Sequence, residues 1–264
     1  STKNGEIYAY PCSTEISCMV VDKEYIEEIQ NNNLFQFLNY CFDNNIQFKN
    51  KIGNKAKDIE FNTLIVYLLT NVDDYIDINN MKLIINKKDF SNIIQEAERI
   101  IQKNTLFNKD NFIIFITVYD IPTIIDIYKN GQVLLPIPSL NVQNSKYRIC
   151  YSNMMGISSF TKVKDAAYEY IKIFDEFMSA SAFTSNFANK KTLVEILSDS
   201  ELDENSKNSI KQIMNNTSDG SFFLRNREVM KAIINEADNY KKGLLTLSEA
   251  VDVIYSKIDL ILNE

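Results

Sequence analysis

The chain opens on Asn4-Gly5-Glu6-Ile7-Tyr8-Ala9-Tyr10-Pro11, and the apolar run Ile16–Val21 follows a few residues later. Apolar and polar residues alternate in the first segment, which is typical of a half-buried strand, and Pro11 predicts its end. The second segment is almost continuously apolar and predicts a buried strand. The sequence therefore predicts two strands close to its start.

Beyond these strands, helical and strand patterns alternate, and from Leu193 onward the pattern is helical throughout. Gly243 predicts the end of one helix, and the capping box Thr246-Leu247-Ser248-Glu249 predicts the start of the last one. The alternation indicates an α/β fold with a helical C-terminal tail, and no internal repeat or linker-like segment divides the chain. We expect helices at 23–31, 34–42, 60–74, 89–103, 121–130 and 164–178, and strands at 82–85, 111–118, 132–138 and 147–157.

Composition excludes several classes of function. The 264 residues contain no His, so a Ser–His–Asp triad, a Cys–His pair and a His-ligated zinc site are excluded. The six Gly stand singly and form neither G-x-G-x-x-G nor a phosphate loop, which argues against nucleotide binding. The net charge of −7 argues against nucleic acid as a partner, because such binders need clustered Lys and Arg.

The cysteines and the hydropathy pattern leave the cellular compartment open. We expect buried free thiols rather than a disulfide framework in a chain of this size. No apolar run approaches the ~18 residues of a membrane span. The chain also lacks an initiating Met, which we interpret as a mature or trimmed product. The four cysteines are Cys12, Cys18, Cys41 and Cys150.

Acidic residues do not single out a metal site or a catalytic pair. Asp73, Asp74 and Asp77 resemble part of a calcium loop, but the Gly and the final Glu of an EF-hand are missing, so an ordinary solvated turn is favoured. Any of the 35 acidic residues could form a pair for glycoside hydrolysis, but no spacing selects one. We therefore expect no metal, no cofactor and no enzymatic activity.

Several segments together resemble one protein family. The opening segment, with Met19-Val20-Val21-Asp22-Lys23 after it, is similar to the start of the hinge region in bacterial extracellular solute-binding proteins. These are the capture components of ABC importers, in their sugar-type branch. The similarity continues in order along the chain, through residues 115–122, 133–138, 155–158, 164–172 and 237–258.

The resemblance implies a type II periplasmic-binding-like fold. Family members begin roughly a hundred residues earlier, so Ser1 would fall near the first hinge crossing. The chain would then comprise most of the C-terminal lobe, residues 13–145 and 179–264. Residues 1–12 and 146–178 would supply the hinge strands and part of the N-terminal lobe.

The resemblance also implies a function. The protein would be a monomer that captures a polar small solute and delivers it to a membrane permease. A carbohydrate is the solute class that we expect first. The absence of Trp weakens the sugar expectation, since Trp often stacks on sugar rings, although Tyr and Phe can replace it. The scarcity of Arg beside abundant Asn, Ile and Lys suggests a low-GC Gram-positive source. The intact protein would then be a cell-surface lipoprotein, held at the membrane by an N-terminal lipid anchor preceding Ser1.

Two alternatives remain open. One is a surface-associated interaction protein that keeps the scaffold without transport. The other is a glycoside hydrolase, in which Asp120 would be essential.

In the family the ligand lies in the cleft between the lobes. Loops at the C-terminal ends of strands line this cleft, as in open α/β sheets generally. By position, the expected lining comes from four places along the chain. It comprises Tyr10, Ser13, Thr14 and Glu15 after the first strand, Tyr119 and Asp120 after Val118, Tyr151 and Asn153 at the second crossing, and Phe222, Phe223 and Arg225 before the last helix pair.

Each of these residues also has a purely structural interpretation. Tyr10, Phe222 and Phe223 could be core aromatics. Asp120 could accept hydrogen bonds from ligand hydroxyls, or it could cap the helix that begins near Pro122. Arg225 could pair with an anionic ligand or with carboxylates on the surface.

Overall fold

The computed structural model describes residues 2–3, 6–7, 10–52, 55–69, 75–77, 80, 82–104, 106, 108–157, 160–180, 190–219 and 227–263. Its centre is a seven-stranded sheet with neighbours in the order β11–β10–β3–β8–β4–β5, and β9 pairs with β3 beside that path. The sheet strands are β3 (Tyr10–Asp22), β4 (Ile46–Ile52), β5 (Lys55–Asp58), β8 (Asn108–Val118), β9 (Gln132–Leu135), β10 (Tyr147–Met155) and β11 (Thr217–Asp219). Two small antiparallel pairs stand apart, β1 (Thr2–Lys3) with β2 (Glu6–Ile7) and β6 (Ile76–Asp77) with β7 (Lys82–Leu83).

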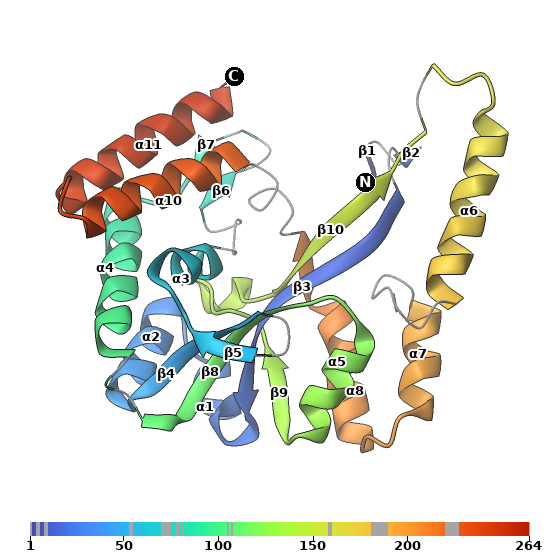
Figure 1. Ribbon diagram of the computed structural model, residues 1–264, viewed down its shortest axis with the longest axis horizontal. Coiled ribbons are helices and arrows are strands. Elements are labelled where there is room, and N and C mark those ends of the chain that lie inside the picture. The colour runs from blue at the N-terminus through green and yellow to red at the C-terminus, as the bar shows by residue number, and fades with distance from the viewer. Residues whose placement is uncertain are drawn as a thin grey trace.

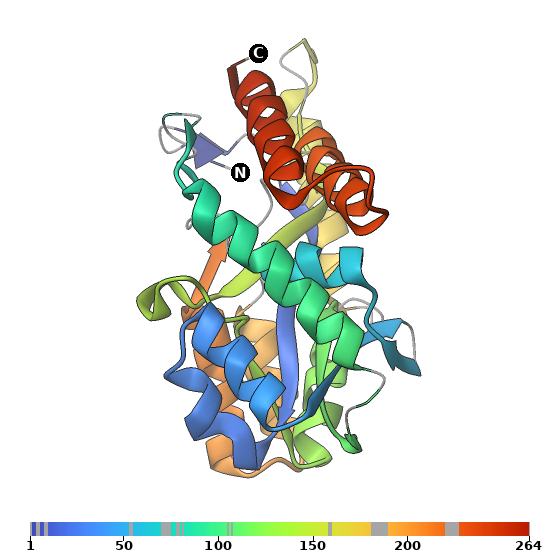
Figure 2. The same cartoon turned by 90° about the vertical axis from the view of Figure 1, so that its left-hand side faces the viewer.

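Helices cover both faces of the sheet. In Figure 1, α2 and α4 lie to the left of the strands, α1 lies below them, and α5, α7 and α8 lie to the right. Figure 2 shows α4 crossing the left-hand face, with α2 below it and the α10–α11 pair above. The helices are α1 (Ile26–Gln30), α2 (Leu34–Asp43), α3 (Phe61–Leu68), α4 (Lys87–Asn104), α5 (Ile121–Lys129), α6 (Lys164–Ala180), α7 (Lys190–Asp199), α8 (Glu204–Asn215), α10 (Arg227–Lys241) and α11 (Leu247–Asn263), with 3-10 turns η1 (Lys23–Tyr25) and η3 (Val142–Asn144).

The core lies on either side of β3 and β8. On one face, Phe48 of β4 stacks on Phe37 of α2 at 5.8 Å and meets Phe115 of β8 edge-on at 5.3 Å between ring centroids. On the other face, Ile16, Cys18 and Val20 are buried. Strand alternation places successive residues on opposite faces, so the continuously apolar run in β3 reflects cover on both sides.

A buried polar cluster fixes the end of α4 against β4. The side chain of Asn104 accepts a hydrogen bond from the Phe48 N–H at 2.7 Å and donates one to the Phe48 carbonyl at 3.0 Å. Gln47 donates to the Asn104 carbonyl and to the carboxylate of Asp58. These contacts give polar residues of β4 partners that lie far away in the sequence.

β3 and β10 together leave the body of the molecule. Residues 16–20 of β3 pair with β8 and residues 19–22 with β9, whereas its earlier residues pair only with β10 among the described strands. Figure 1 shows the two strands running side by side from the centre toward β1, β2 and the upper end of α6. We call the paired segments 10–15 and 150–155 the ribbon.

Most predicted elements are confirmed, and the differences have physical reasons. The strand does not end at Pro11, because among the described strands β3 pairs there with β10 alone and proline is tolerated in a strand with an open edge. The predicted helix 60–74 ends at Leu68 within the described residues. β11 interrupts the region predicted to be all helical, and β4 and β5 were not predicted at all.

Candidate functional site

One face of the sheet carries a row of polar residues where the ribbon joins the body. Ser17 of β3 pairs with Thr117 of β8 on one side and with Arg148 of β10 on the other. Directly opposite residues of antiparallel strands point to the same face, so these three side chains share it. Glu15, two residues before Ser17, pairs with Cys150 and continues the row on the same face.

Glu15 is the acidic member of this row. Ile16 pairs with Val118, so Glu15 and Tyr119 are neighbours at the point where β8 ends. Glu15 is half-buried, and no hydrogen bond or ion pair occupies its carboxylate in the described part of the chain. A half-buried carboxylate without a protein partner is available to accept hydrogen bonds from a ligand.

Tyr119 and Tyr67 add aromatic and hydroxyl groups. Tyr119 is 60% exposed, so its ring is accessible from solvent. Tyr67 of α3 packs on Phe115 at 5.2 Å between ring centroids and hydrogen-bonds the Thr117 side chain. Burial raises the pKa of Tyr67, and the bond to Thr117 acts in the opposite direction, so the phenol stays protonated at neutral pH.

Arg148 forms the floor of the row on the β10 side. Its side chain is 1% exposed, and one guanidinium nitrogen donates to the Asn144 carbonyl at 3.4 Å. A buried guanidinium stays charged, and its burial costs free energy unless it is well paired.

Asp120 caps α5, as one of its two interpretations predicted. Its Oδ1 accepts from the Thr123 N–H at 2.7 Å, and its Oδ2 accepts from the Thr123 hydroxyl at 3.1 Å. Both oxygens therefore have a structural role, and the proposed role of Asp120 in ligand binding stays a prediction.

The remaining predicted residues are placed by their backbones or lie outside the described residues. Ser13 pairs with Ser152, Thr14 with Tyr151, and Tyr10 with Met155, so the first strand and the second crossing are adjacent along the ribbon. Asn153 lies in the same part of β10. Phe222, Phe223 and Arg225 fall outside the described residues, as does most of the acidic turn with Asp73 and Asp74.

Sequence reasoning missed Ser17, Thr117, Tyr67 and Arg148. A signal for the first was present, because Ser13, Glu15 and Ser17 recur with the period of two that marks one face of a strand. Thr117 and Tyr119 repeat the same period in the neighbouring strand. Tyr67 carried no such signal, since only the packing of α3 brings it to this row.

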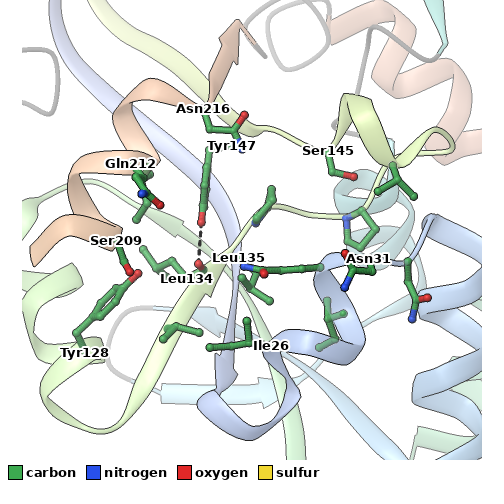
Figure 3. Close-up of a pocket in the computed structure, with 18 residues that line it drawn as sticks. Ile26, Asn31, Tyr128, Leu134, Leu135, Ser145, Tyr147, Ser209, Gln212 and Asn216 are labelled. Carbon is green, nitrogen blue, oxygen red and sulfur yellow. Dashed lines mark hydrogen bonds between the residues drawn. The ribbon is translucent and has the colours of Figure 1, made fainter. Parts of the chain in front are cut away.

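The described residues show other features relevant to function. None of the described helices is both long and apolar enough to cross a membrane. Within the same residues, no cluster of three or more acidic or Cys side chains is placed to hold a metal ion. Cys18 and Cys41 are buried free thiols, as predicted, and burial raises the pKa of each well above that of an ordinary thiol. A separate pocket of about 490 Å³, lined by none of the predicted ligand residues, lies among α1, β9 and α8 (Figure 3).

Comparisons by sequence find no relatives. No protein-family model matches the chain, and no curated protein does.

Comparisons by structure find many similar chains. An extracellular solute-binding protein of family 1 from Alicyclobacillus acidocaldarius has a TM-score of 0.58 at 9% identity, covering 100% of this chain and 74% of its own. The maltose/maltodextrin-binding domain MalE from Bdellovibrio bacteriovorus, bound to maltotriose, has a TM-score of 0.56 at 9% identity, covering 100% of this chain and 75% of its own. A de novo designed esterase has a TM-score of 0.55 at 11% identity, covering 99% and 74%.

At these identities the likeness establishes the architecture. It extends over the whole of this chain and about three quarters of the solute-binding proteins. The chain has the mixed α/β fold of the extracellular solute-binding proteins of family 1 and the maltose-binding proteins.

Proposed function

We propose that this chain is the solute-capturing component of an ABC importer and that it binds a polar small solute, most readily a carbohydrate. The observation that carries the proposal is the half-buried carboxylate of Glu15, which has no hydrogen-bond or ion-pair partner among the described residues, beside the exposed ring of Tyr119. A carboxylate accepts hydrogen bonds from sugar hydroxyls, and an aromatic face suits the C–H face of a sugar ring. The maltotriose bound to the similar Bdellovibrio domain supports a carbohydrate as the first class to test.

The proposed mechanism is closure of two lobes over the solute. One lobe comprises residues 13–145 and 179–264, and the other includes residues 1–12 and 146–178. A solute that touches both lobes stabilises the closed arrangement, which a membrane permease then recognises. The ribbon of β3 and β10 would be the connection between the lobes.

The proposed ligand-binding residues are those along the ribbon and at the ends of the neighbouring elements. We propose that the protein acts outside the cell as a monomer with a lipid anchor, and that it has no enzymatic activity. The ligand-binding set is Tyr10, Ser13, Thr14, Glu15, Tyr119, Asp120, Tyr151, Asn153, Phe222, Phe223 and Arg225.

Thermal unfolding with added solutes tests this proposal. A ligand at 100 times its Kd stabilises the folded state by about 2.7 kcal/mol, which corresponds to a rise in Tm of roughly 5–10 °C for a chain of this size. Maltotriose is the first probe, followed by other neutral oligosaccharides, amino sugars, polyamines and short peptides. A failure of every solute to raise Tm would contradict the proposal.

Variants link any stabilisation to the proposed site. Glu15→Gln keeps the shape of the side chain but removes its charge, and it should weaken binding by about tenfold or more, as expected for a lost charged hydrogen bond. Tyr119→Ala should weaken binding by a similar factor. Glu28→Gln on the exposed side of α1 is the matched control and should leave the Tm shift unchanged. Equal shifts in all three variants would place the solute elsewhere.

A second candidate function rests on α6. Phe160, Val163 and Ile173, on and before this helix, are 92%, 64% and 63% exposed. Exposed apolar side chains gathered on one element are typical of interaction surfaces. A surface-associated interaction protein without transport would show no stabilisation by any small solute.

A further inference from the structure

The pocket among α1, β9 and α8 is separate from the polar row that contains Glu15. Tyr147 lines it, whereas the next residue, Arg148, belongs to the polar row. None of the residues that line the pocket belongs to that row or to the groups beside it, Tyr67 and Tyr119. The volume of about 490 Å³ falls within the roughly 300–1,000 Å³ typical of small-molecule pockets.

The floor of this pocket is apolar and rigid. Val133, Leu134 and Leu135 of β9 line it and are at most 7% exposed. The Tyr147 hydroxyl donates a hydrogen bond to the Leu134 carbonyl at 2.7 Å, which fixes the tyrosine ring as one wall (Figure 3). Pro136 restricts the backbone that follows β9. The cavity is therefore formed without a ligand.

The walls carry amides and hydroxyls but no charge. None of the 18 lining residues is Asp, Glu, Lys or Arg. Charged residues make up 24% of the chain, so a random set of that size would contain about four. Amides enter the lining from two elements on opposite sides, with Gln30, Asn31 and Asn32 from α1 and its end, and Gln212 and Asn216 from α8 and its end.

Several of these polar groups have hydrogen-bonding capacity to spare. In the described part of the chain, the side chains of Gln212 and Ser209 form no hydrogen bond with protein. Asn31 and Asn32 donate their amide N–H groups to the Glu27 and Glu28 carbonyls at 3.2 and 2.6 Å, which leaves their side-chain oxygens as acceptors. Figure 3 shows Gln212 and Ser209 on one side of the cavity and Asn31 across from them.

We propose that this pocket is a second ligand site, separate from the one beside Glu15, for an uncharged amphipathic small molecule. Such a ligand would place an apolar chain or ring on β9 and hydroxyl or amide groups against the asparagine and glutamine side chains. An ionised ligand would lose its hydration without meeting an opposite charge, and a pure hydrocarbon would bury the amides unpaired.

Binding of matched small probes tests the charge preference. Hexyl β-D-glucoside is the neutral probe, and hexanoate and hexylammonium are its charged counterparts. We expect the neutral probe to bind saturably with a Kd of about 1 mM or tighter, shifting backbone NMR signals of residues 133–135 and 209–216. Both charged probes should bind at least about tenfold more weakly. Absence of saturable binding, or equal binding of all three probes, would overturn the proposal.

Variants on the exposed surface of α8 test the location. Ser209→Trp should fill the cavity and weaken the glucoside by at least about tenfold. Asn208→Trp, on the neighbouring exposed position outside the pocket, is its matched control and should bind as the natural chain does. Gln212→Glu places a carboxylate in the wall, and it should raise hexylammonium affinity while lowering that of the glucoside. Two results together would place the site elsewhere. One is unchanged glucoside affinity in a folded Ser209→Trp variant, and the other is an unchanged preference for the glucoside over hexylammonium in Gln212→Glu.

Discussion

Replacing Asn104 with Ala should remove the polar contact that fixes α4 against the sheet. Asn104 is 2% exposed, and its side chain both accepts from and donates to the Phe48 backbone. The Phe48 carbonyl keeps a second partner, the Ile59 N–H at 3.2 Å, but the Phe48 N–H would be left buried and unpaired. An orphaned buried donor costs about 1–3 kcal/mol and a lost ordinary hydrogen bond about 1, so we expect the free energy of unfolding to fall by about 2–4 kcal/mol.

Urea unfolding followed by circular dichroism measures this loss. Asn104→Asp is a useful comparison with Asn104→Ala. Its carboxylate can still accept a hydrogen bond from the Phe48 N–H, but its second oxygen cannot donate to the Phe48 carbonyl. Asn208→Ala, on the exposed side of α8, is the control and should change the free energy of unfolding by less than about 0.5 kcal/mol. A loss below about 0.5 kcal/mol for Asn104→Ala would refute the view that these two hydrogen bonds are buried and unreplaced.

Three further changes have expected outcomes in the same assay. Asp120→Ala should lower the free energy of unfolding by about 1 kcal/mol, because the helix cap to Thr123 is lost. A clearly larger loss would contradict a purely local effect of this cap. Gly243→Ala should cost about 1–2 kcal/mol, because φ is +72° there and no atom lies near enough for packing to contribute. The hydrogen bond from Lys257 lowers the pKa of Glu236 below its ordinary 4.5, so this contact stabilises the fold above that pH and is lost as pH falls through the folded pKa. Glu236→Gln should accordingly show a smaller loss of stability between about pH 6 and about pH 3 than the natural chain, and an unchanged loss would exclude this pair as a source of the acid sensitivity.

Features set by local chemistry could be predicted from the sequence. Thr246 and Glu249 form the capping box, with each side chain bonded to the other residue's backbone N–H. Gly243 adopts the left-handed conformation that ends the preceding helix. Each depends on residues within one helical turn, which is the range over which a single sequence is informative.

Elements stabilised by distant partners could not be predicted in this way. β4 contains Gln47, Lys49 and Asn50, whose polarity argues against a strand until the contacts with Asp58 and Asn104 are known. β11 comprises only Thr217–Asp219 and is a strand because β10 lies beside it. In both cases tertiary pairing overrides local preference.

The candidate site falls between these two cases. The family resemblance predicted Glu15 and Tyr119 as residues that follow a strand, although Glu15 lies within β3. Their adjacency follows from the pairing of Ile16 with Val118. That register depends on two strands about a hundred residues apart, and a change of one residue would turn Glu15 to the other face. The residue types were therefore predictable, whereas their assembly into one row was not.

The strand pairing of the ribbon predicts that it twists more easily than it bends. Across residues 10–15 and 150–155, two antiparallel strands pair only with each other among the described strands. In-plane bending would have to stretch inter-strand hydrogen bonds, whereas twist changes them little, and two-stranded ribbons span a wider range of twist than broad sheets do. Whatever the ribbon carries should therefore rotate about the ribbon's long axis rather than slide across the body. Glu15 and Cys150 lie at the end of the ribbon that joins the body, where the rotation relative to the body is smallest.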